Sequence, residues 1–245
     1  MEQNRRLREA MSGARVTPID LASKLGVDPK TIQRWISGRI PYPRHRADVA
    51  KLLGEDEAFL WPETASGPGA AGSEIIRTYP YRSAVPMELW QRLFRNAENR
   101  IRVLAFSGLF LPETDPNLID HLRQKAKDGV KIEILMGDPD CEAVRVRGLD
   151  EGIGEAMSAK IRNVLAFYKP LVGEPGISIG LHPTTLYNSV YQYDDEMLVN
   201  THLYGAPAAH APVHHLRWLS SGSLFTSYTK SVDRASEASK PLESK

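Results

Sequence analysis

The chain has 245 residues, of which 42% are hydrophobic and 25% are charged, close to the averages of soluble globular proteins. These proportions exclude a disordered or fibrous protein, and no apolar run approaches the roughly eighteen residues that a membrane-spanning helix needs. The length fits one or two domains, and we expect two. Because the sequence opens on charged rather than apolar residues, we expect no secretory signal and a cytoplasmic protein.

The distribution of charge divides the chain. Residues 1–51 carry eleven Lys and Arg against five Asp and Glu, whereas the remaining residues carry 20 against 25. Such segregation indicates that the N-terminal part meets a polyanion and that the rest does not. The single cysteine, Cys141, excludes an internal disulfide and a zinc site built on cysteine pairs.

Residues 1–62 predict an all-α domain, because polar caps and short turns separate apolar patterns of helical period. Thr17 is the predicted N-cap of one helix, and Gly26 is predicted to end it. A second helix is predicted over residues 29–36 and stops at Gly38. Two short helices joined by a tight glycine turn form a helix-turn-helix unit.

The second helix of this unit has the side chains of a helix that reads a DNA groove. Ile32, Trp35 and Ile36 share an apolar face, so the polar side chains project from the opposite side. Glutamine can pair bidentately with adenine and arginine with guanine, and arginines in the following loop can contact phosphates. The side chains predicted to contact double-stranded DNA are Thr17, Lys30, Thr31, Gln33, Arg34, Arg39, Arg44 and Arg46.

The run LREAMSGARVTPIDLASKLGVDPKTIQRWISGRIPYPRHRADVAKLLG resembles the helix-turn-helix of the Cro/C1 repressor-like, or XRE, family. It combines the two predicted helices, Trp35 at a core position and a Gly-Arg exit loop. The resemblance implies a compact bundle of four or five helices that binds DNA, and it leaves the operator sequence open. The alternative is an all-helical interaction module whose basic face is only solvated.

A stretch without large apolar residues, ETASGPGAAGS, predicts a linker over residues 63–80. Over residues 81–235, predicted strands alternate with predicted helices, which indicates an α/β domain with a mixed sheet. A polar tail over 236–245 is expected to fray. The predicted helices are 86–99, 117–129, 155–168 and 216–235, and the predicted strands are 101–110, 130–138, 176–182 and 186–200.

The segments NRIRVLAFSGLFLPE and LIDHLRQKAKDGVKIEILMGDPD are similar to the first strand, helix and second strand of a phospholipase D-like half. In active members a later strand carries HxK(x)4D, whose histidine is the nucleophile and whose lysine holds phosphate. The matching positions here are Tyr187, Ser189 and Asp194, so only the aspartate remains. Because an unperturbed tyrosine, with a pKa of about 10, is mostly protonated at neutral pH, the resemblance implies a degenerate domain that binds without cutting. We expect no catalytic residue, cofactor or metal.

A ligand pocket is expected where the strands of such a domain end. An arginine from the glycine-rich segment 145–152, expected to be a loop, can hold a phosphate or carboxylate. The same residues also fit plain turn, surface or packing roles. His210, His214 and His215 do not predict a metal site, because adjacent strand side chains point to opposite faces. The predicted ligand-binding residues are Ser107, Asp138, Arg145, Arg147, Glu151, Tyr187, Ser189 and Asp194.

These observations predict a DNA-binding transcriptional regulator whose C-terminal domain senses a small-molecule effector, forms a homodimer, or does both. Two-fold operators and the small interface of one module favour pairing. Two alternatives stay open. One is a DNA-tethered nuclease or phosphodiesterase with an unusual nucleophile such as His182 or Tyr187, and the other is an antitoxin-like or scaffolding protein that binds a protein partner.

Overall fold

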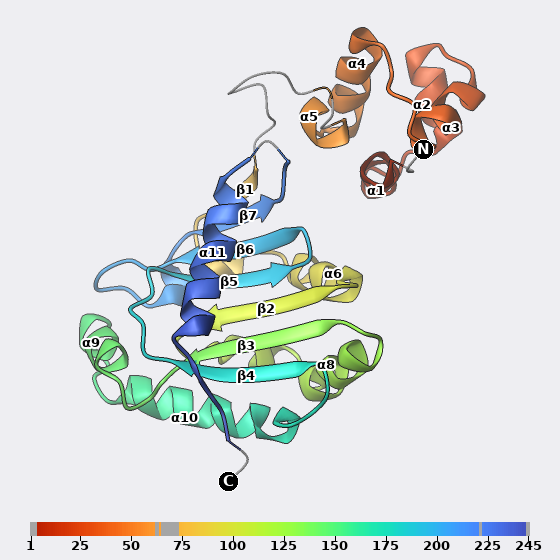
Figure 1. The fold of residues 1–245 in the computed structure, drawn as a ribbon. Coiled ribbons are helices and arrows are strands. Elements are labelled where there is room, and N and C mark those ends of the chain that lie inside the picture. The colour runs from red at the N-terminus through yellow and green to blue at the C-terminus, as the bar shows by residue number, and fades with distance from the viewer. Residues whose placement is uncertain (1–3, 62–63, 65–73, 221, 244–245) are drawn as a thin grey trace. The chain divides into compact units, whose positions relative to one another are not determined.

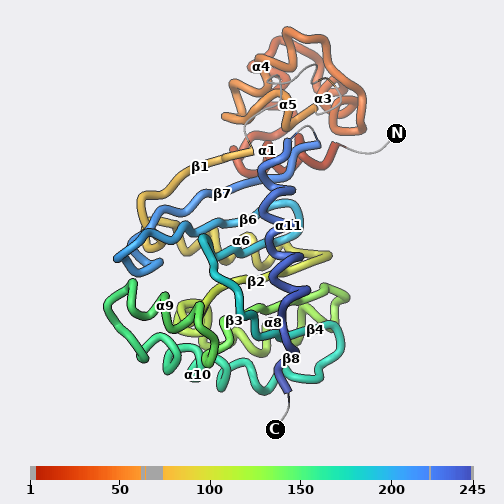
Figure 2. The backbone as a smooth tube through the Cα atoms, turned by 60° about the vertical axis from the view of Figure 1, so that its left-hand side comes forward, coloured from red at the N-terminus to blue at the C-terminus, as the bar shows by residue number. Residues whose placement is uncertain are grey.

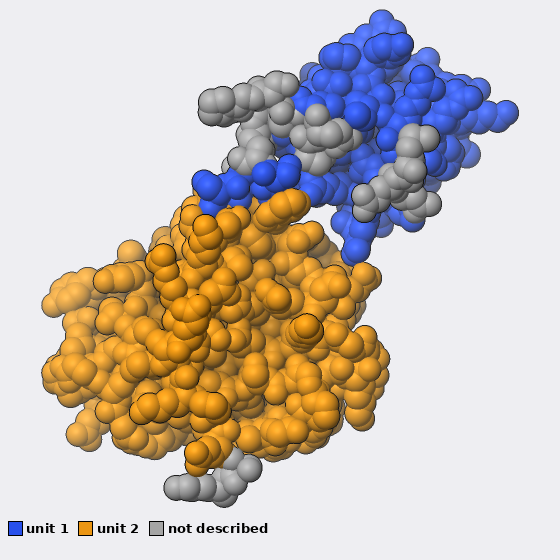
Figure 3. All heavy atoms as spheres, in the orientation of Figure 1, with its two compact units in different colours: residues 1–74, 219–223 blue, residues 75–218, 224–245 orange. Residues whose placement is uncertain are grey.

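The computed structural model describes residues 4–61, 64, 74–220 and 222–243. The chain divides into two compact units, residues 1–74 with 219–223 and residues 75–218 with 224–245, which Figure 3 colours separately. No helix among the described residues is long and apolar enough to cross a membrane.

The described residues of the first unit form short helices around one apolar core. The helices are α1 (Arg5–Gly13), α2 (Pro18–Leu25), α3 (Pro29–Ile36), α4 (Pro43–Leu53) and α5 (Glu57–Leu60). Each of them buries one face, as the helical spacing of the apolar residues requires. The largest buried side chains of this core are Leu7, Leu21, Ile32, Trp35, Leu60 and Trp61.

Local hydrogen bonds set the ends of α2 and α3. The Thr17 hydroxyl oxygen accepts from the Asp20 amide at 3.2 Å, and the Asp20 carboxylate accepts from the Thr17 amide at 3.0 Å, which completes a capping box. Gly26 ends α2 with φ of 64°, a left-handed conformation that glycine adopts without strain. Asp28 caps α3 by accepting from the Lys30 amide at 2.7 Å.

The second unit is built on a mixed sheet, as the sequence predicts, but the sheet has 8 strands, more than the four that the sequence indicates. Its spatial order is β1-β7-β6-β5-β2-β3-β4-β8, and Figure 2 follows it from one edge to the other. β2 runs parallel to β3, and β3 to β4, whereas the other neighbours are antiparallel. The strands are β1 (Ile75–Tyr79), β2 (Arg100–Ala105), β3 (Lys131–Gly137), β4 (Ile177–His182), β5 (Asn188–Tyr193), β6 (Glu196–Thr201), β7 (Val213–Arg217) and β8 (Lys240–Pro241).

Helices pack on both faces of this sheet. α6 and α8 cover one face, and α11 crosses the other (Figure 1). The helices are α6 (Met87–Asn96), α7 (Phe110–Thr114), α8 (Leu118–Lys127), α9 (Glu142–Asp150), α10 (Ala156–Tyr168) and α11 (Leu224–Glu237). Short 3₁₀ helices occupy Arg82–Ala84, Lys169–Leu171 and Ala208–His210.

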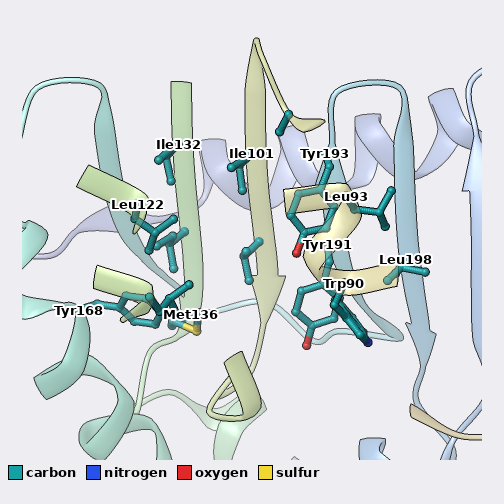
Figure 4. Packing of buried hydrophobic residues seen from close by; sticks show 14 of the residues in the cluster. Trp90, Leu93, Ile101, Leu122, Ile132, Met136, Tyr168, Tyr191, Tyr193 and Leu198 are labelled. Carbon is teal, nitrogen blue, oxygen red and sulfur yellow. The ribbon is translucent and has the colours of Figure 1, made fainter. Parts of the chain in front are cut away.

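Aromatic packing anchors the core on the α6 side of the sheet (Figure 4). Trp90 meets Phe110 and Tyr191 edge to face, with ring centroids 4.9 and 5.1 Å apart. Burial raises the pKa of Tyr168, Tyr191 and Tyr193, so these phenols stay protonated. The edge-to-face pairs of Trp90 stabilise the core beyond the burial of their surfaces, because ring edges meet ring faces.

Both ends of the second unit differ from the sequence prediction. The predicted linker over 63–80 contains β1, which pairs with β7, because its β-branched and aromatic residues suit a strand. Besides β1, the structure describes only Thr64, Glu74 and Pro80 of that linker, and its other residues lie outside the described part of the chain. At the other end, the predicted tail contains the last turn of α11 and strand β8, which pairs with β4.

Three internal predictions are also corrected. The predicted loop over 145–152 is mostly helix α9, and its glycine at position 148 allows a close approach to the backbone of Gly154. The predicted strand over 186–200 is a hairpin, β5 and β6, turning at Asp194. The predicted helix over 216–235 begins only at Leu224, since its first residues complete β7.

Candidate functional site

The outer side of α3 is the first candidate site. Lys30, Gln33 and Arg34 are exposed there, while Thr31 is half-buried. The opposite side of the helix is fixed in the core by Ile32, Trp35 and Ile36. Among the described residues, no carboxylate pairs with the side chains of Lys30, Arg34, Arg39 or Arg44. These cations are therefore available to a polyanion.

Two of the predicted DNA contacts already have partners within the first unit. The Thr17 hydroxyl donates to the Asp20 carboxylate at 2.6 Å, and this bond lowers the pKa of Asp20. Arg46 pairs with Glu57 at 2.6 Å and donates to the Pro41 carbonyl at 3.2 Å, and its side chain is only 15% exposed. Thr17 thus fixes the start of α2, and Arg46 fixes the loop that follows α3.

An exposed tyrosine that the sequence reasoning missed lies in the same loop. Tyr42 is 74% exposed, directly before α4 and between Arg39 and Arg44 in sequence. Tyrosine hydroxyls contact phosphate oxygens in many DNA complexes. The sequence offered a signal for this residue. A tyrosine flanked by two prolines in a basic loop belongs to no apolar helix or strand pattern, which favours an exposed position.

The second candidate site is the edge of the sheet where β2, β3 and β4 end. There the Ser189 hydroxyl and the His202 Nε2 lie 3.0 Å apart, and the His202 Nδ1 is 3.1 Å from the Leu186 carbonyl oxygen. Because a carbonyl can only accept, Nδ1 carries the proton and Nε2 accepts from Ser189. Burial lowers the pKa of His202 to about 4, so this imidazole is neutral at pH 7.

A second histidine, the buried His182, also lies near the Phe106 ring. The ring centroids of His182 and His202 are 5.9 and 5.7 Å from that of Phe106. His182 Nε2 donates to the Ala105 carbonyl at 3.2 Å, and its Nδ1 accepts from the Thr184 hydroxyl at 3.1 Å. Burial lowers the pKa of His182 as well. The sequence reasoning did not select His202, since this residue follows a strand with no motif around it.

The two arginines of α9 that were predicted to bind a ligand have different contacts. Arg147 pairs with Glu151 in a buried ion pair and donates to the carbonyls of Leu203 and Ala206 at 3.3 and 2.9 Å. It therefore holds the loop after β6 in place. Arg145 pairs instead with Glu142 on the exposed surface of the helix.

The three positions of the degenerate motif do not converge. Ser189 lies at the start of β5, whereas Asp194 follows its end, about 17 Å along the strand at 3.4 Å per residue. Asp194 has φ of 47°, and its carboxylate accepts from the amides of Glu98, Asn99 and Arg100 at 2.6 to 3.0 Å. It connects the β5–β6 turn to the start of β2. The prediction that Asp194 lies together with the other ligand residues is therefore wrong.

The remaining predicted ligand residues flank the strand ends. Ser107 follows β2 and is half-buried, and Asp138 follows β3, where its side chain accepts from the Asp140 amide at 3.0 Å. Tyr187 precedes β5 and is 77% exposed. No three His, Cys, Asp or Glu side chains among the described residues lie together as metal ligands would.

Comparisons with known proteins give distant structural similarities. No protein-family model and no curated protein sequence matches the chain. The archaeal chromatin protein TrmBL2, described as showing a novel mode of DNA binding, aligns with a TM-score of 0.44 and 11% identity over 81% of this chain and 62% of its own. Nuc of Salmonella typhimurium, a phospholipase D family member, aligns with a TM-score of 0.37 and 16% identity over 64% and 90%.

A third solved structure, the phosphatidylserine synthase of Haemophilus influenzae Rd KW20, aligns with a TM-score of 0.46 and 12% identity over 91% of this chain and 53% of its own. The chain thus spans less than two thirds of both this synthase and TrmBL2. Similarities at this level assign no function to the chain.

Proposed function

We propose that the protein is a DNA-binding transcriptional regulator in which α2 and α3 form a helix-turn-helix and α3 enters the major groove. The exposed polar side of α3 carries this proposal. Its lysine, glutamine and arginine project from a helix whose other side is fixed in the core, and its cations have no carboxylate partner among the described residues. Such a rigid, capped helix presents its donors in a constant geometry, as base readout requires.

The basic loop between α3 and α4 supports the same proposal. Arg39, Tyr42 and Arg44 are exposed there, and the Arg46–Glu57 ion pair holds the loop against the rest of the unit. Phosphate contacts from such a loop would fix the register of α3 in the groove. The resemblance of residues 7–54 to the XRE family supports this assignment independently of the structure.

We propose that the second unit regulates this binding and does not cut nucleic acid. At the edge where the strands end, each imidazole donates to a backbone carbonyl and accepts from a hydroxyl; His182 is buried and His202 is half-buried. A nucleophile must reach its substrate, and these rings are already engaged with the protein. The alternative of an unusual nuclease, with His182 or Tyr187 as nucleophile, is therefore the weaker proposal.

Substitutions on α3 test the DNA-binding proposal. After selection of preferred duplexes from a random pool, fluorescence anisotropy is expected to show that Gln33→Ala and Arg34→Ala each weaken binding by about 1–3 kcal/mol and relax the preference at one base pair. The same titration, run to saturation, measures the stoichiometry, and two chains per two-fold site are expected.

Lys51→Ala is the matched control, because it removes one exposed positive charge from the same unit but from α4. It is expected to leave the base preference unchanged. A pool that yields no preferred sequence, or equal binding by all three variants, would contradict the proposal.

A further inference from the structure

A groove in the second unit lies at the opposite end of the parallel strands from the two histidines. Its volume is about 540 Å³. This volume falls within the range of small-molecule sites. The polar residues that line it are Arg100, Arg102, Lys131, Glu133, Ser178 and Asp233.

The floor of the groove is an ion network with fixed geometry. Arg102, only 5% exposed, donates to Glu133 and to Asp233 at 2.6 Å each. Glu133 also accepts from the Ser236 hydroxyl at 2.5 Å. Both carboxylates of the groove are therefore engaged with Arg102, which joins β2, β3 and α11.

Above this floor stand two cations without such partners. Arg100 and Lys131 are in register on the adjacent parallel strands β2 and β3, and both are exposed. No described carboxylate pairs with either side chain. Like charges directly side by side on a sheet destabilise it, so an anion between these two cations would relieve their repulsion.

The neighbouring strand adds backbone to the groove beside these cations. Because Ile132 pairs with Ile177, Gly176 stands next to Lys131, and it lines the groove with backbone atoms alone. Its φ of 82° favours glycine, and a side chain at this position would point toward Ala126 of α8, which does not line the groove.

We propose that this groove binds a small molecule through a phosphate or carboxylate group held between Arg100 and Lys131. The Arg100 guanidinium offers a planar fork to two oxygens of the anion, and the Lys131 ammonium adds a compact charge. Ser178 lines the wall formed by β4, where its hydroxyl donates to the Ile132 carbonyl at 3.3 Å. This site goes beyond the proposed DNA-binding function and stands without it, since none of its residues belongs to the first unit.

Titration of the full chain tests the site directly. At constant ionic strength, inorganic phosphate and, separately, malonate are added while amide shifts are followed by NMR. Saturable shifts at Arg100, Lys131 and Gly176 are expected with at least one probe, and the tighter probe assigns the group as phosphate or carboxylate. Arg100→Gln and Lys131→Gln are each expected to weaken binding about tenfold, as when one charge-assisted hydrogen bond is lost.

Arg95→Gln is the matched control, because Arg95 is an exposed cation of the same unit that does not line the groove. It is expected to bind like the wild type. Thermal unfolding adds a second readout. Without anion at low salt, Lys131→Gln is expected to melt at a higher temperature than the wild type, because the repulsion from Arg100 is removed. Added phosphate is expected to raise the melting temperature of the wild type and of Arg95→Gln more than that of the two groove variants. Shifts that fail to saturate, or equal binding by all three variants, would overturn the proposal.

Discussion

His202 shows how one half-buried side chain makes the second unit sensitive to acid. Its proton sits on Nδ1, toward the Leu186 carbonyl, and its Nε2 accepts from Ser189. Both bonds suit the neutral ring, whereas protonation would place a poorly solvated charge beside Phe106. Burial therefore sets the pKa, and the hydrogen bonds set the tautomer.

The stability of the second unit is expected to fall between pH 6.5 and about 4. The pKa of His202 drops from 6.5 in the unfolded chain to about 4 in the fold, so its contribution is complete above the first value and is lost as the pH falls toward the second. The loss is at most about 3 kcal/mol, and urea unfolding followed by circular dichroism at several pH values measures it.

His202→Gln preserves a donor and an acceptor but does not titrate. Its free energy of unfolding is expected to depend less steeply on pH over the same interval, with His182 accounting for what remains, because burial lowers that pKa too. Parallel pH curves for variant and wild type would contradict this account.

At the scale of elements, Glu196 connects three of them. Its carboxylate accepts from both terminal nitrogens of Arg92 on α6, at 3.1 and 3.0 Å, and from His215 Nε2 on β7 at 2.6 Å. Burial raises the pKa of Glu196, but the bonds from His215 and Arg92 outweigh burial and bring it to about 2. One carboxylate on β6 thus holds a helix and a neighbouring strand.

Glu196→Gln is expected to destabilise the second unit by about 1–3 kcal/mol at pH 7, because Arg92 and His215 lose their shared anion. The difference from wild type is expected to shrink as the pH falls from about 4.5 toward about 2, since Glu196 itself is then protonated. Glu174→Gln, which breaks a half-buried pair between one carboxylate and Arg123, is the control and is expected to cost less than Glu196→Gln. Equal losses for the two variants in denaturant unfolding would contradict the prediction.

The elements that could be predicted from sequence are those with strong local signals. The Thr17 capping box and Gly26 set the ends of α2, and the helix predicted over 29–36 is confirmed as α3. Strands β3 and β4 lie within about one residue of the predicted ranges, because each is a short apolar run beside a glycine or polar turn. Strand β2 begins one residue before its predicted range of 101–110 but ends at Ala105, five residues short of it.

The features that sequence could not give depend on contacts between distant residues. Strand β1 becomes a strand by pairing with β7, far along the chain. The buried histidines and the Arg100–Lys131 pair arise from register across strands, and no local pattern marks them. Asp194 is the opposite case, in which a local motif suggested a ligand-binding role. Its carboxylate instead accepts hydrogen bonds from backbone amides at the start of β2.

At the scale of the whole molecule, the separation of charge predicts a strong salt dependence of DNA binding. Four cations of the first unit without described carboxylate partners, Lys30, Arg34, Arg39 and Arg44, are the expected phosphate and base contacts. If all four displace counterions, the slope of log affinity against log salt is about −4 for each bound chain, or about a hundredfold loss per chain between 50 and 200 mM. Anisotropy titrations at several salt concentrations measure it.

Arg44→Gln is expected to reduce the magnitude of that slope by about 0.9, because one counterion fewer is released. Arg100→Gln removes the same charge from the second unit and is expected to leave the slope unchanged. A slope near zero, or the same change in both variants, would show that DNA meets the protein elsewhere.

The pairing of β1 with β7 also bears on the order in which the chain is made. Ile75 lies opposite Leu216, so the first strand of the second unit has no partner until nearly the whole sheet has been synthesised. The helices α1 to α5 end at residue 60, and the buried residues of their apolar core lie between Leu7 and Trp61. On the ribosome, the proposed DNA-binding unit can therefore form first, while the segment IIRTY waits as an open strand edge that a chaperone or a neighbouring nascent chain can pair.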